Sequence, residues 1–295
     1  MPPTVAAIIP EYDESSRSID RTLRAILNQA AAPDSVIVVD DASPSGPPQI
    51  EPDLAQRVMS VSLNRNSGVS TARNRGAAIT QADYLLFTNC DVELAPGWIE
   101  RAAAFMDASP QCGAASGRII PLYGRRTLRE WRLQHIETKV HRSAVSQPTQ
   151  VTWLVGHVLF VRRTAFEAID GFDPGYRRAG DDPDLCQRLT AAGWQNYHLP
   201  ELSAMSHERA SIESLARKSV RNTGWNLRAE CEPCKAVKPL RPLPASVATL
   251  RKLIVRLGRD LVRGRPRFVP VDFAVAAESL RLIWLASLRP GALNS

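Results

Sequence analysis

The chain has 295 residues, 44% of them hydrophobic and 23% charged, a composition that is ordinary for a folded globular protein with a substantial core. No window approaches the roughly 20 uninterrupted apolar residues that a membrane-spanning helix needs. Residues 1–4 lack the basic-then-apolar pattern of a signal peptide. The five cysteines are odd in number and scattered, which argues against a disulfide framework. We therefore expect a cytoplasmic protein.

The net charge of +7 is unevenly distributed along the chain. Residues 209–295 contain 17 Lys/Arg and 6 Asp/Glu, whereas residues 1–208 contain 20 and 24. This asymmetry suggests that the two parts of the chain have different functions. We predict a first domain over residues 1–230 and a basic helical extension over residues 231–295. At the start of that extension, Cys231 and Cys234 have the spacing of half a zinc site, but no second pair follows, so the interpretation as two reduced thiols is preferred.

Along the first domain, short apolar runs alternate with helical patterns. This alternation predicts an α/β domain with a largely parallel sheet, flanked by helices and followed by the C-terminal helical extension. Ligands bind beyond the carboxyl ends of such strands, so polar residues at the strand ends should share one crevice. The predicted strands cover residues 5–10, 36–41, 58–63 and 84–88, the first three of them buried, and the predicted helices cover residues 19–29 and 70–80.

The second half of the first domain is less regular. A helix is predicted over residues 97–106, a strand near 113–120 and a basic helix over 125–141. An apolar run over 153–161 contains Gly156, and a further helix is predicted over 184–192. Residues 195–198 and 202–207 are predicted as a strand and a loop.

Acidic residues crowd a glycine turn before this last helix, at Asp181, Asp182 and Asp184. Another acid, Asp91, follows the strand that ends at residue 88. One acid delivered by a strand end and another by a turn can converge in one cleft. There, one can hold a metal on a phosphate while the other takes a proton. A competing interpretation makes Asp182 a helix N-cap, with Pro183 at the first helical position.

Five motifs in this order resemble those of family-2 glycosyltransferases. The resemblance covers roughly residues 4 to 210. It implies a GT-A fold, a nucleotide-sugar donor (a UDP-sugar favoured), Mg²⁺ or Mn²⁺, and transfer to an acceptor hydroxyl with inversion at the anomeric carbon. The motifs are Ala7-Ile8-Ile9-Pro10-Glu11-Tyr12, Val38-Val39-Asp40-Asp41-Ala42-Ser43, Asn66 to Gly76, Asn89-Cys90-Asp91, and Gly171-Phe172-Asp173 through Gly180-Asp181-Asp182.

The resemblance also implies roles for residues near the nucleotide. Asp41 would accept the imino hydrogen of a uracil-type base. The residues that would frame the base are Pro10, Glu11 and Tyr12. Those that would border the nucleotide are Asn66, Gly68 and Arg73, with Arg73 offering charge to the diphosphate. At residue 11 the family more often has a small residue, and at residue 13 it more often has Asn.

The remaining implied roles concern the metal and the chemistry. Asp91 matches the last acid of the family's DxD motif and would hold the metal, which His207 would complete. Asn89 stands at the first acid of that motif and could instead contact the sugar. Asp182 matches the catalytic base, and Asp181 would orient the acceptor.

Alternatives remain open at this point. A nucleotidyltransferase is disfavoured because no Gly-rich basic loop follows residue 10. The replacement of the first DxD acid by Asn89 also permits a non-catalytic nucleotide-sugar-binding or scaffold protein. A nucleic-acid partner is not expected, because the tail has few aromatics and no binding motif. The sugar, the nucleotide and the acceptor are not identified.

The extension carries an apolar stripe at helical spacing, interspersed with basic residues. We predict that this helix makes peripheral contact with an anionic membrane surface; the equally supported alternative is that it packs onto the catalytic domain. The apolar residues are Val247, Leu250, Ile254, Leu257 and Leu261, and the basic ones are Arg251, Lys252, Arg256, Arg259, Arg263, Arg265 and Arg267.

Overall fold

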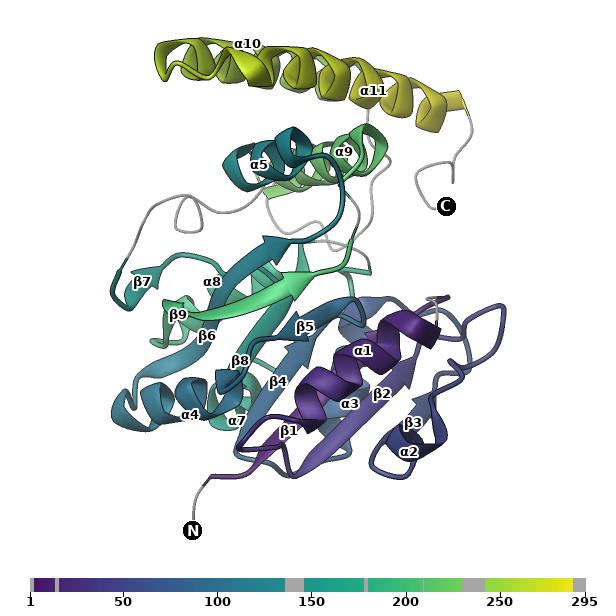
Figure 1. Cartoon of the computed structure of the whole chain (residues 1–295), viewed down its shortest axis with the longest axis vertical. Helices are drawn as coiled ribbons and strands as arrows, with labels where there is room; N and C mark the ends of the chain where they lie inside the picture. Colours follow the sequence, from purple (N-terminus) through teal and green to yellow (C-terminus); the bar gives the residue numbers. More distant parts are fainter. Residues whose placement is uncertain are drawn as a thin grey trace. The chain divides into compact units, whose positions relative to one another are not determined.

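The protein was studied as a computed structural model, which describes residues 3–13, 16–135, 146–177, 180–208, 210–229 and 242–288. The chain forms two compact units (Figure 1). Unit 1 comprises residues 1–120 and 139–207, and unit 2 comprises residues 121–138 and 208–295. This division differs from the predicted boundary after residue 230, because the helix α9 (Ile212–Ala229) packs against the two helices that follow it. Cys231 and Cys234 lie outside the described residues.

Unit 1 is built on a mixed sheet in which the described strands follow the order β3-β2-β1-β4-β8-β6-β9-β5, with β7 paired to β9. The neighbouring strands β3, β2, β1 and β4 run parallel to one another. The pairs β4–β8, β8–β6, β9–β5 and β9–β7 are antiparallel. The strands are β1 (Val5–Glu11), β2 (Ser35–Asp40), β3 (Met59–Ser62), β4 (Tyr84–Thr88), β5 (Val92–Leu94), β6 (Cys112–Pro121), β7 (Thr149–Val151), β8 (Val158–Arg162) and β9 (Gln195–Ser206).

Helices cover both faces of this sheet, which explains the continuous apolar runs of its central strands. Successive side chains of β1 point to opposite faces: Ala7 and Ile9 join one core cluster, and Ala6 and Ile8 join the other. The helices of the unit are α1 (Ser16–Leu27), α2 (Pro52–Ala55), α3 (Val69–Ala78), α4 (Trp98–Ala108), α7 (Arg163–Glu167) and α8 (Asp181–Ala191). The predicted α/β class is thereby confirmed.

Two local expectations differ from the structure. The strand predicted as buried over residues 58–63 is the sheet edge β3, where Met59 is 52% exposed and β2 is the one paired neighbour among the described strands. Residues 195–198 and 202–207, predicted as a strand and a loop, belong to the single long strand β9 and the residue after it. Pairing with β5 and β7 keeps this strand extended.

Unit 2 is helical. Its helices are α5 (Arg126–His135), α9, α10 (Pro242–Val262) and α11 (Val269–Leu288), with the short 3₁₀ helix η1 (Pro266–Phe268) before α11. Its core gathers Trp131, Leu215, Phe268 and Val275. The helix predicted over 125–141 is described as far as His135, and the remainder lies outside the described residues. Among the helices of the described ranges, none is long and apolar enough to cross a membrane.

Candidate active site

The carboxyl ends of the parallel strands carry the acidic residues that the sequence singled out. Glu11 ends β1 beside Asp40 at the end of β2, and the amide of Asp41 donates to the carbonyl of Glu11 at 2.8 Å. Ser43 ties the two ends together: its amide donates to Asp40 Oδ1 at 2.9 Å and its hydroxyl to Glu11 Oε2 at 3.1 Å. The buried side chain of Glu11 therefore supports the loop after β2. Tyr12, which follows Pro10 and Glu11, is 43% exposed, and its aromatic ring lies at the same edge of the sheet.

Asp41 anchors the loop that precedes α3. Its two carboxylate oxygens accept from the amides of Ser67 at 2.6 Å and Gly68 at 2.7 Å. Gly68 has a φ of 93°, and a Cβ built on it would lie 2.5 Å from the Cα of Arg177, so only glycine fits here. Arg177 in turn donates to the side chain of Asn66 at 3.0 Å. Since each carboxylate oxygen has a second lone pair, Asp41 can hold this loop and still accept one hydrogen from a base.

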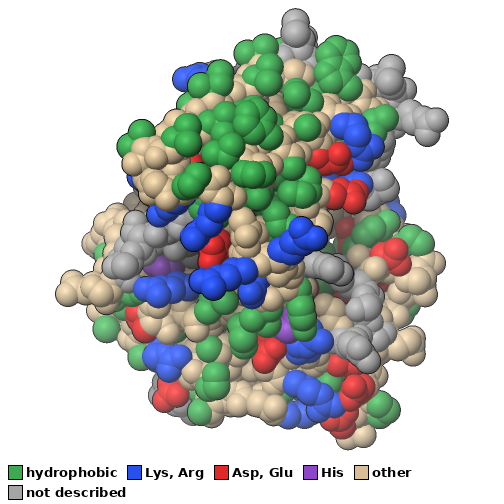
Figure 2. Space-filling model, turned by 45° about the horizontal axis from the view of Figure 1, so that its top comes forward, with side chains coloured by type: hydrophobic (Ala, Val, Ile, Leu, Met, Phe, Trp, Pro, Cys, Tyr) green, Lys and Arg blue, Asp and Glu red, His purple; other side chains and the backbone are tan. Residues whose placement is uncertain are grey.

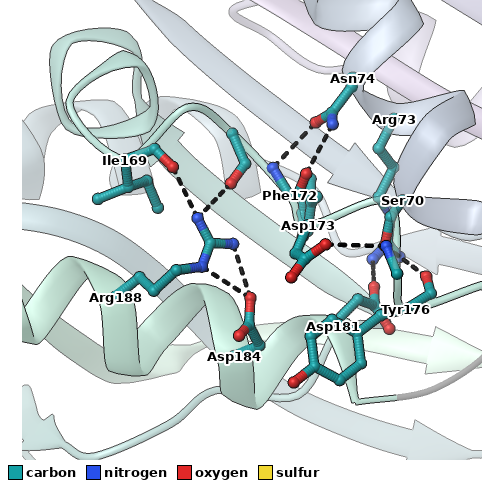
Figure 3. A network of polar contacts seen from close by, with 12 residues as sticks. Ser70, Arg73, Asn74, Ile169, Phe172, Asp173, Tyr176, Asp181, Asp184 and Arg188 are labelled. Atoms are coloured by element: carbon teal, nitrogen blue, oxygen red, sulfur yellow. Dashed lines mark hydrogen bonds and ion pairs between the residues drawn. The ribbon is translucent and has the colours of Figure 1, made fainter. Parts of the chain in front are cut away.

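Arg73 on α3 is the centre of a buried polar network (Figure 3). Its guanidinium forms an ion pair with Asp181, as Figure 3 shows. It also donates to Asn89 Oδ1 at 3.2 Å and to the carbonyl of Gly156 at 2.8 Å. The Arg73 side chain is only 3% exposed and that of Asp181 only 8%. The planar guanidinium thus joins the end of β4 to the start of α8, two segments about 90 residues apart in the sequence. Its described contacts are with protein groups, at a place where the sequence predicted contact with a diphosphate.

Asp182 is held by a different partner. The amide of Gly156 donates to Asp182 Oδ2 at 2.7 Å. A Cβ on Gly156 would lie 3.0 Å from the Asp182 Cβ and 3.1 Å from Oδ2, so this close approach requires glycine. Burial, reinforced by the negative charge of Asp181, raises the pKa of Asp182 to about 7. A carboxylate with a pKa near the working pH can both take and release a proton, as a general base must.

The competing interpretation of Asp182 as an N-cap is wrong. The helix α8 begins at Asp181, its N-cap is Gly180 with a φ of 92°, and no side chain caps it. Asp182 is the second helical residue and Pro183 the third. Its carboxylate accepts from the Gly156 amide.

The third acid of the cluster has a structural partner. Asp184 pairs with Arg188 at 2.7 Å, one helical turn later. Arg188 also donates to the carbonyls of Ile169 and Gly171, both at 2.7 Å, so the pair holds the turn that leads into α8 (Figure 3). The three crowded acids therefore have three separate environments. Asp182 is partly exposed and has a pKa raised to about 7, whereas burial raises the pKa of Asp184 against the opposing effect of its Arg188 partner.

The predicted metal residues Asp91 and His207 meet through the backbone. Val92 and Ser206 are partners in the β5–β9 pair, and the amide of His207 donates to the carbonyl of Asp91 at 2.9 Å. The His207 ring lies between two side chains: its Nε2 is 3.0 Å from Glu93 Oε2, and its Nδ1 contacts the guanidinium of Arg21. Because a guanidinium can only donate, Nδ1 accepts and Nε2 carries the hydrogen given to Glu93.

The donor set suits a divalent cation only in part. In the described ranges, no group of three His, Cys, Asp or Glu side chains is arranged to hold a metal ion. One carboxylate and one imidazole leave most positions of a six-coordinate cation to other oxygens, such as those of a diphosphate. Both nitrogens of the His207 ring have partners here, Glu93 at Nε2 and Arg21 at Nδ1, so a cation could bind Nδ1 only in place of the Arg21 guanidinium. The Glu93 carboxylate would then support the ring, as carboxylates usually do for metal-binding histidines.

Three residues of this site were not predicted from the sequence. Gly156 was visible as a glycine inside an apolar run, but nothing indicated that its amide would meet Asp182. Glu93 lies two residues after Asp91, and its pairing with His207 follows from the β5–β9 register. Arg21 had no local signal, because its position on α1 resembles that of any exposed helical arginine.

Comparisons with known proteins agree with this geometry. Residues 6–170 match the family described as Glycosyl transferase family 2. The chain is 29% identical over 226 residues to N-acetylglucosaminyl-diphospho-decaprenol L-rhamnosyltransferase of Mycobacterium tuberculosis, covering 65% of this chain and 73% of the relative. It is 23% identical over 198 residues to glucosyl-dolichyl phosphate glucuronosyltransferase of Haloferax volcanii, covering 60% and 58%.

A solved structure shares the fold. The mannosyltransferase PcManGT from Pyrobaculum calidifontis, determined with GDP-Man and Mn²⁺, superposes with a TM-score of 0.62 at 17% identity, covering 96% of this chain and 87% of that one. The family match spans more than half of the chain and includes the strand ends that carry Glu11, Asp41 and Asp91. The chain belongs to glycosyl transferase family 2 and is a glycosyltransferase with a GT-A fold.

Proposed function

We propose that the protein is an inverting, hexosyl-type transferase that moves a sugar from a nucleotide-diphosphate donor, with a UDP-sugar favoured, to an acceptor hydroxyl. The observation that carries this proposal is Asp182: a partly exposed carboxylate with its pKa raised to about 7 and its position set by the Gly156 amide. A base of this kind matches the requirement of a single direct displacement.

In the proposed reaction, Asp182 takes the proton of the acceptor hydroxyl as that oxygen forms a bond to the anomeric carbon. The bond between this carbon and the diphosphate oxygen breaks, and the nucleoside diphosphate leaves with the bonding electrons. Attack in line with the departing group inverts the anomeric centre. Asp181 orients the acceptor and is paired with Arg73, and its negative charge adds to the effect of burial on the pKa of Asp182.

The donor would lie along the carboxyl ends of the parallel strands. We assign the base to Asp41 and the ring of Tyr12, with Pro10 and Glu11 shaping the strand end. Asn66 and Gly68 would border the ribose and diphosphate through the loop that Asp41 anchors. Asn89, whose side chain accepts from Arg73, would contact the donor sugar.

Asp91 and His207 would hold Mg²⁺ or Mn²⁺ against the donor diphosphate, and Glu93 would support the His207 ring. Such a cation supplies positive charge to the leaving diphosphate. Support comes from the donor set and from the backbone pairing of the two residues. Mn²⁺ is present in the mannosyltransferase that shares the fold.

The acceptor that we propose is a sugar carried on a polyprenyl or dolichyl phosphate lipid, as in cell-envelope polysaccharide synthesis. Two relatives are named for such lipid-linked acceptors. We place the reaction in the cytoplasm, at the inner face of the membrane. The basic extension would make the peripheral contact with that face.

A second candidate is a non-catalytic protein that binds nucleotide sugars. The observation that favours it is Asn89, which replaces the first acid of the DxD motif. Thermal shift with a panel of nucleotide sugars and Mn²⁺ identifies the donor, because a bound ligand raises the apparent stability. NMR of the product of that donor with a lipid-linked sugar then tests transfer and the anomeric configuration. A donor that binds without hydrolysis or transfer under any metal condition would favour the non-catalytic candidate.

A further inference from the structure

Exposed apolar side chains gather on two helices of unit 2. Of the fourteen large hydrophobic side chains that are exposed in the described part of the chain, nine lie on α10 and α11. Figure 2 shows hydrophobic side chains gathered over this region. We name these nine residues the apolar face: Val247, Leu250, Ile254, Val255, Leu261, Val262, Phe273, Trp284 and Leu285.

The apolar face is distinct from the packing face of the same helices. On α10, Val247, Ile254 and Leu261 recur every seven residues and so lie on one side of the helix. Ile254 is 71% exposed and Val262 is 89% exposed. On α11, the eleven residues between Phe273 and Trp284 are about three helical turns, so both rings project from one side. The core of the unit takes the other positions, which are Ala245, Val271, Val275, Leu282 and Ile283.

The exposed charge around this face is mainly positive. Unit 2 contains 21 Lys/Arg and 9 Asp/Glu, a balance of +12. Two acids of its last two helices, Asp260 and Asp272, are fully buried, so their carboxylates do not offset the surface charge. Exposed basic side chains include Arg251, Arg263 and Arg267.

Two of the basic residues that the sequence analysis grouped with the surface charge are partly buried in the structure. Arg256 stacks over the Trp131 ring, 4.8 Å from its centroid, and burial lowers the pKa of Lys252 to about 8. The Trp131 indole donates to Asp272 at 2.9 Å beneath them. Lys252 and Arg256 are therefore partly buried within unit 2, and the surface charge depends on the remaining arginines.

We propose that the apolar face docks onto an anionic lipid bilayer, with its aliphatic and aromatic side chains at the boundary between headgroups and acyl chains and with Arg251, Arg263 and Arg267 against lipid phosphates. Amphipathic helices with aromatic and aliphatic residues on one side and arginines beside them lie in this interface. A second copy of the chain is the poorer occupant, because two surfaces of the same positive charge repel. Nucleic acid would pair with the arginines but leave the apolar side chains in water.

The proposal is tested by binding of the full chain to vesicles, without donor or metal, so that the outcome is independent of glycosyl transfer. Vesicles of phosphatidylcholine with phosphatidylglycerol are compared with phosphatidylcholine alone, at low and high salt. We expect flotation with the anionic vesicles, weakened by salt because the charge contribution is screened. Quenching of Trp284 by brominated lipid, with Trp284→Phe as the blank, should place the indole near the headgroup boundary.

Two variants separate the apolar and the charged contributions. Ile254→Asp with Leu261→Asp should lower the partition coefficient at least tenfold, on both vesicle types. Arg251→Gln with Arg263→Gln should lower it about fivefold per residue on the anionic vesicles and leave weak binding to neutral vesicles unchanged. Because all four side chains are exposed, the circular dichroism of these variants should match that of the parent. Met59→Asp, at an equally exposed position of unit 1, is the matched control and should bind as the parent does.

Three results would overturn the proposal. The first is vesicle binding that neither pair of substitutions changes. The second is loss of self-association, seen by light scattering without lipid, as the only effect of Ile254→Asp with Leu261→Asp, which would make the apolar face a contact between copies. The third is preferential binding of nucleic acid over anionic vesicles at equal salt.

Discussion

Substitution of Asp182 by Asn tests the proposed base through two independent measurements. Asn keeps the size of the side chain and an oxygen that can accept from the Gly156 amide, but it cannot take a proton. General-base catalysis typically contributes about 10²–10⁴-fold, so turnover should fall at least a hundredfold. Donor affinity should stay nearly unchanged, because the proposed donor contacts lie elsewhere in the crevice.

The pH dependence of the parent follows from the same group. With a pKa of about 7, Asp182 is mostly protonated at pH 6 and mostly ionised at pH 8. The proposed base acts when ionised, so kcat/KM should rise with pH through about 7. Asp182→Asn should lose this rising limb.

The second measurement is the free energy of unfolding. Its contribution from Asp182 should fall as the pH rises, whereas the activity should increase. The pKa of Asp182 is 3.8 in a model peptide and about 7 in the folded protein, so the folded state favours the protonated form. The stabilisation linked to this proton is fully present below about pH 4 and is lost as pH rises through about 7. Asn carries no charge at any of these pH values, so Asp182→Asn should gain about 2 kcal/mol over the parent between pH 5 and pH 8.

Chemical denaturation at pH 5 and pH 8, together with kinetics across the same range, checks both expectations. A variant that is inactive yet more stable at pH 8 is the result expected when a functional carboxylate has a raised pKa in the folded protein. Turnover above a tenth of the parent value would refute the role of Asp182 as base, and Asp181→Asn would then be the variant to test. Lower stability at pH 8 would refute the raised pKa.

Three further outcomes are expected from the same site. Gly156→Ala should lower kcat and displace the pH profile while leaving donor binding intact, because its Cβ would meet the Asp182 side chain at 3.0 Å; single-turnover kinetics with a donor titration checks this. Asp91→Ala should abolish metal-dependent binding of nucleoside diphosphate, whereas Asn89→Asp should be tolerated and tighten it, because a second carboxylate favours a hard cation and Arg73 can donate to it; calorimetry with and without Mn²⁺ distinguishes the two. Arg73→Met should destabilise the protein by about 3 kcal/mol or more, because it leaves a buried carboxylate unpaired, and equilibrium unfolding measures it.

The amino-acid sequence by itself determined the class of the fold and the edge at which the site lies. Continuous apolar runs at residues 5–10, 36–39 and 84–88 are local signals of strands buried on both faces, and the structure has strands there. The acids that follow these strands must then meet at one sheet edge, because parallel strands end at the same side. This inference needs only the pattern along the chain.

The tertiary structure alone decided which acid has which partner. The pairing of Asp181 with Arg73, and of Asp182 with the Gly156 amide, joins segments about 110 and 26 residues apart, and no local pattern encodes such contacts. Asp181 and Asp182 look alike in the sequence, but their surroundings differ. Asp181 is paired with the charge of Arg73, whereas burial raises the pKa of Asp182.

The same distinction holds for the two-sided helices of unit 2. Helical spacing along α10 predicted a single apolar stripe, but not whether that stripe was packed or exposed. The core around Trp131 uses other positions of the helix, turns Lys252 and Arg256 inward, and leaves Ile254 and Leu261 in solvent. The periodicity is a property of one helix, whereas burial depends on which surfaces the neighbouring helices cover, and only the folded chain determines that.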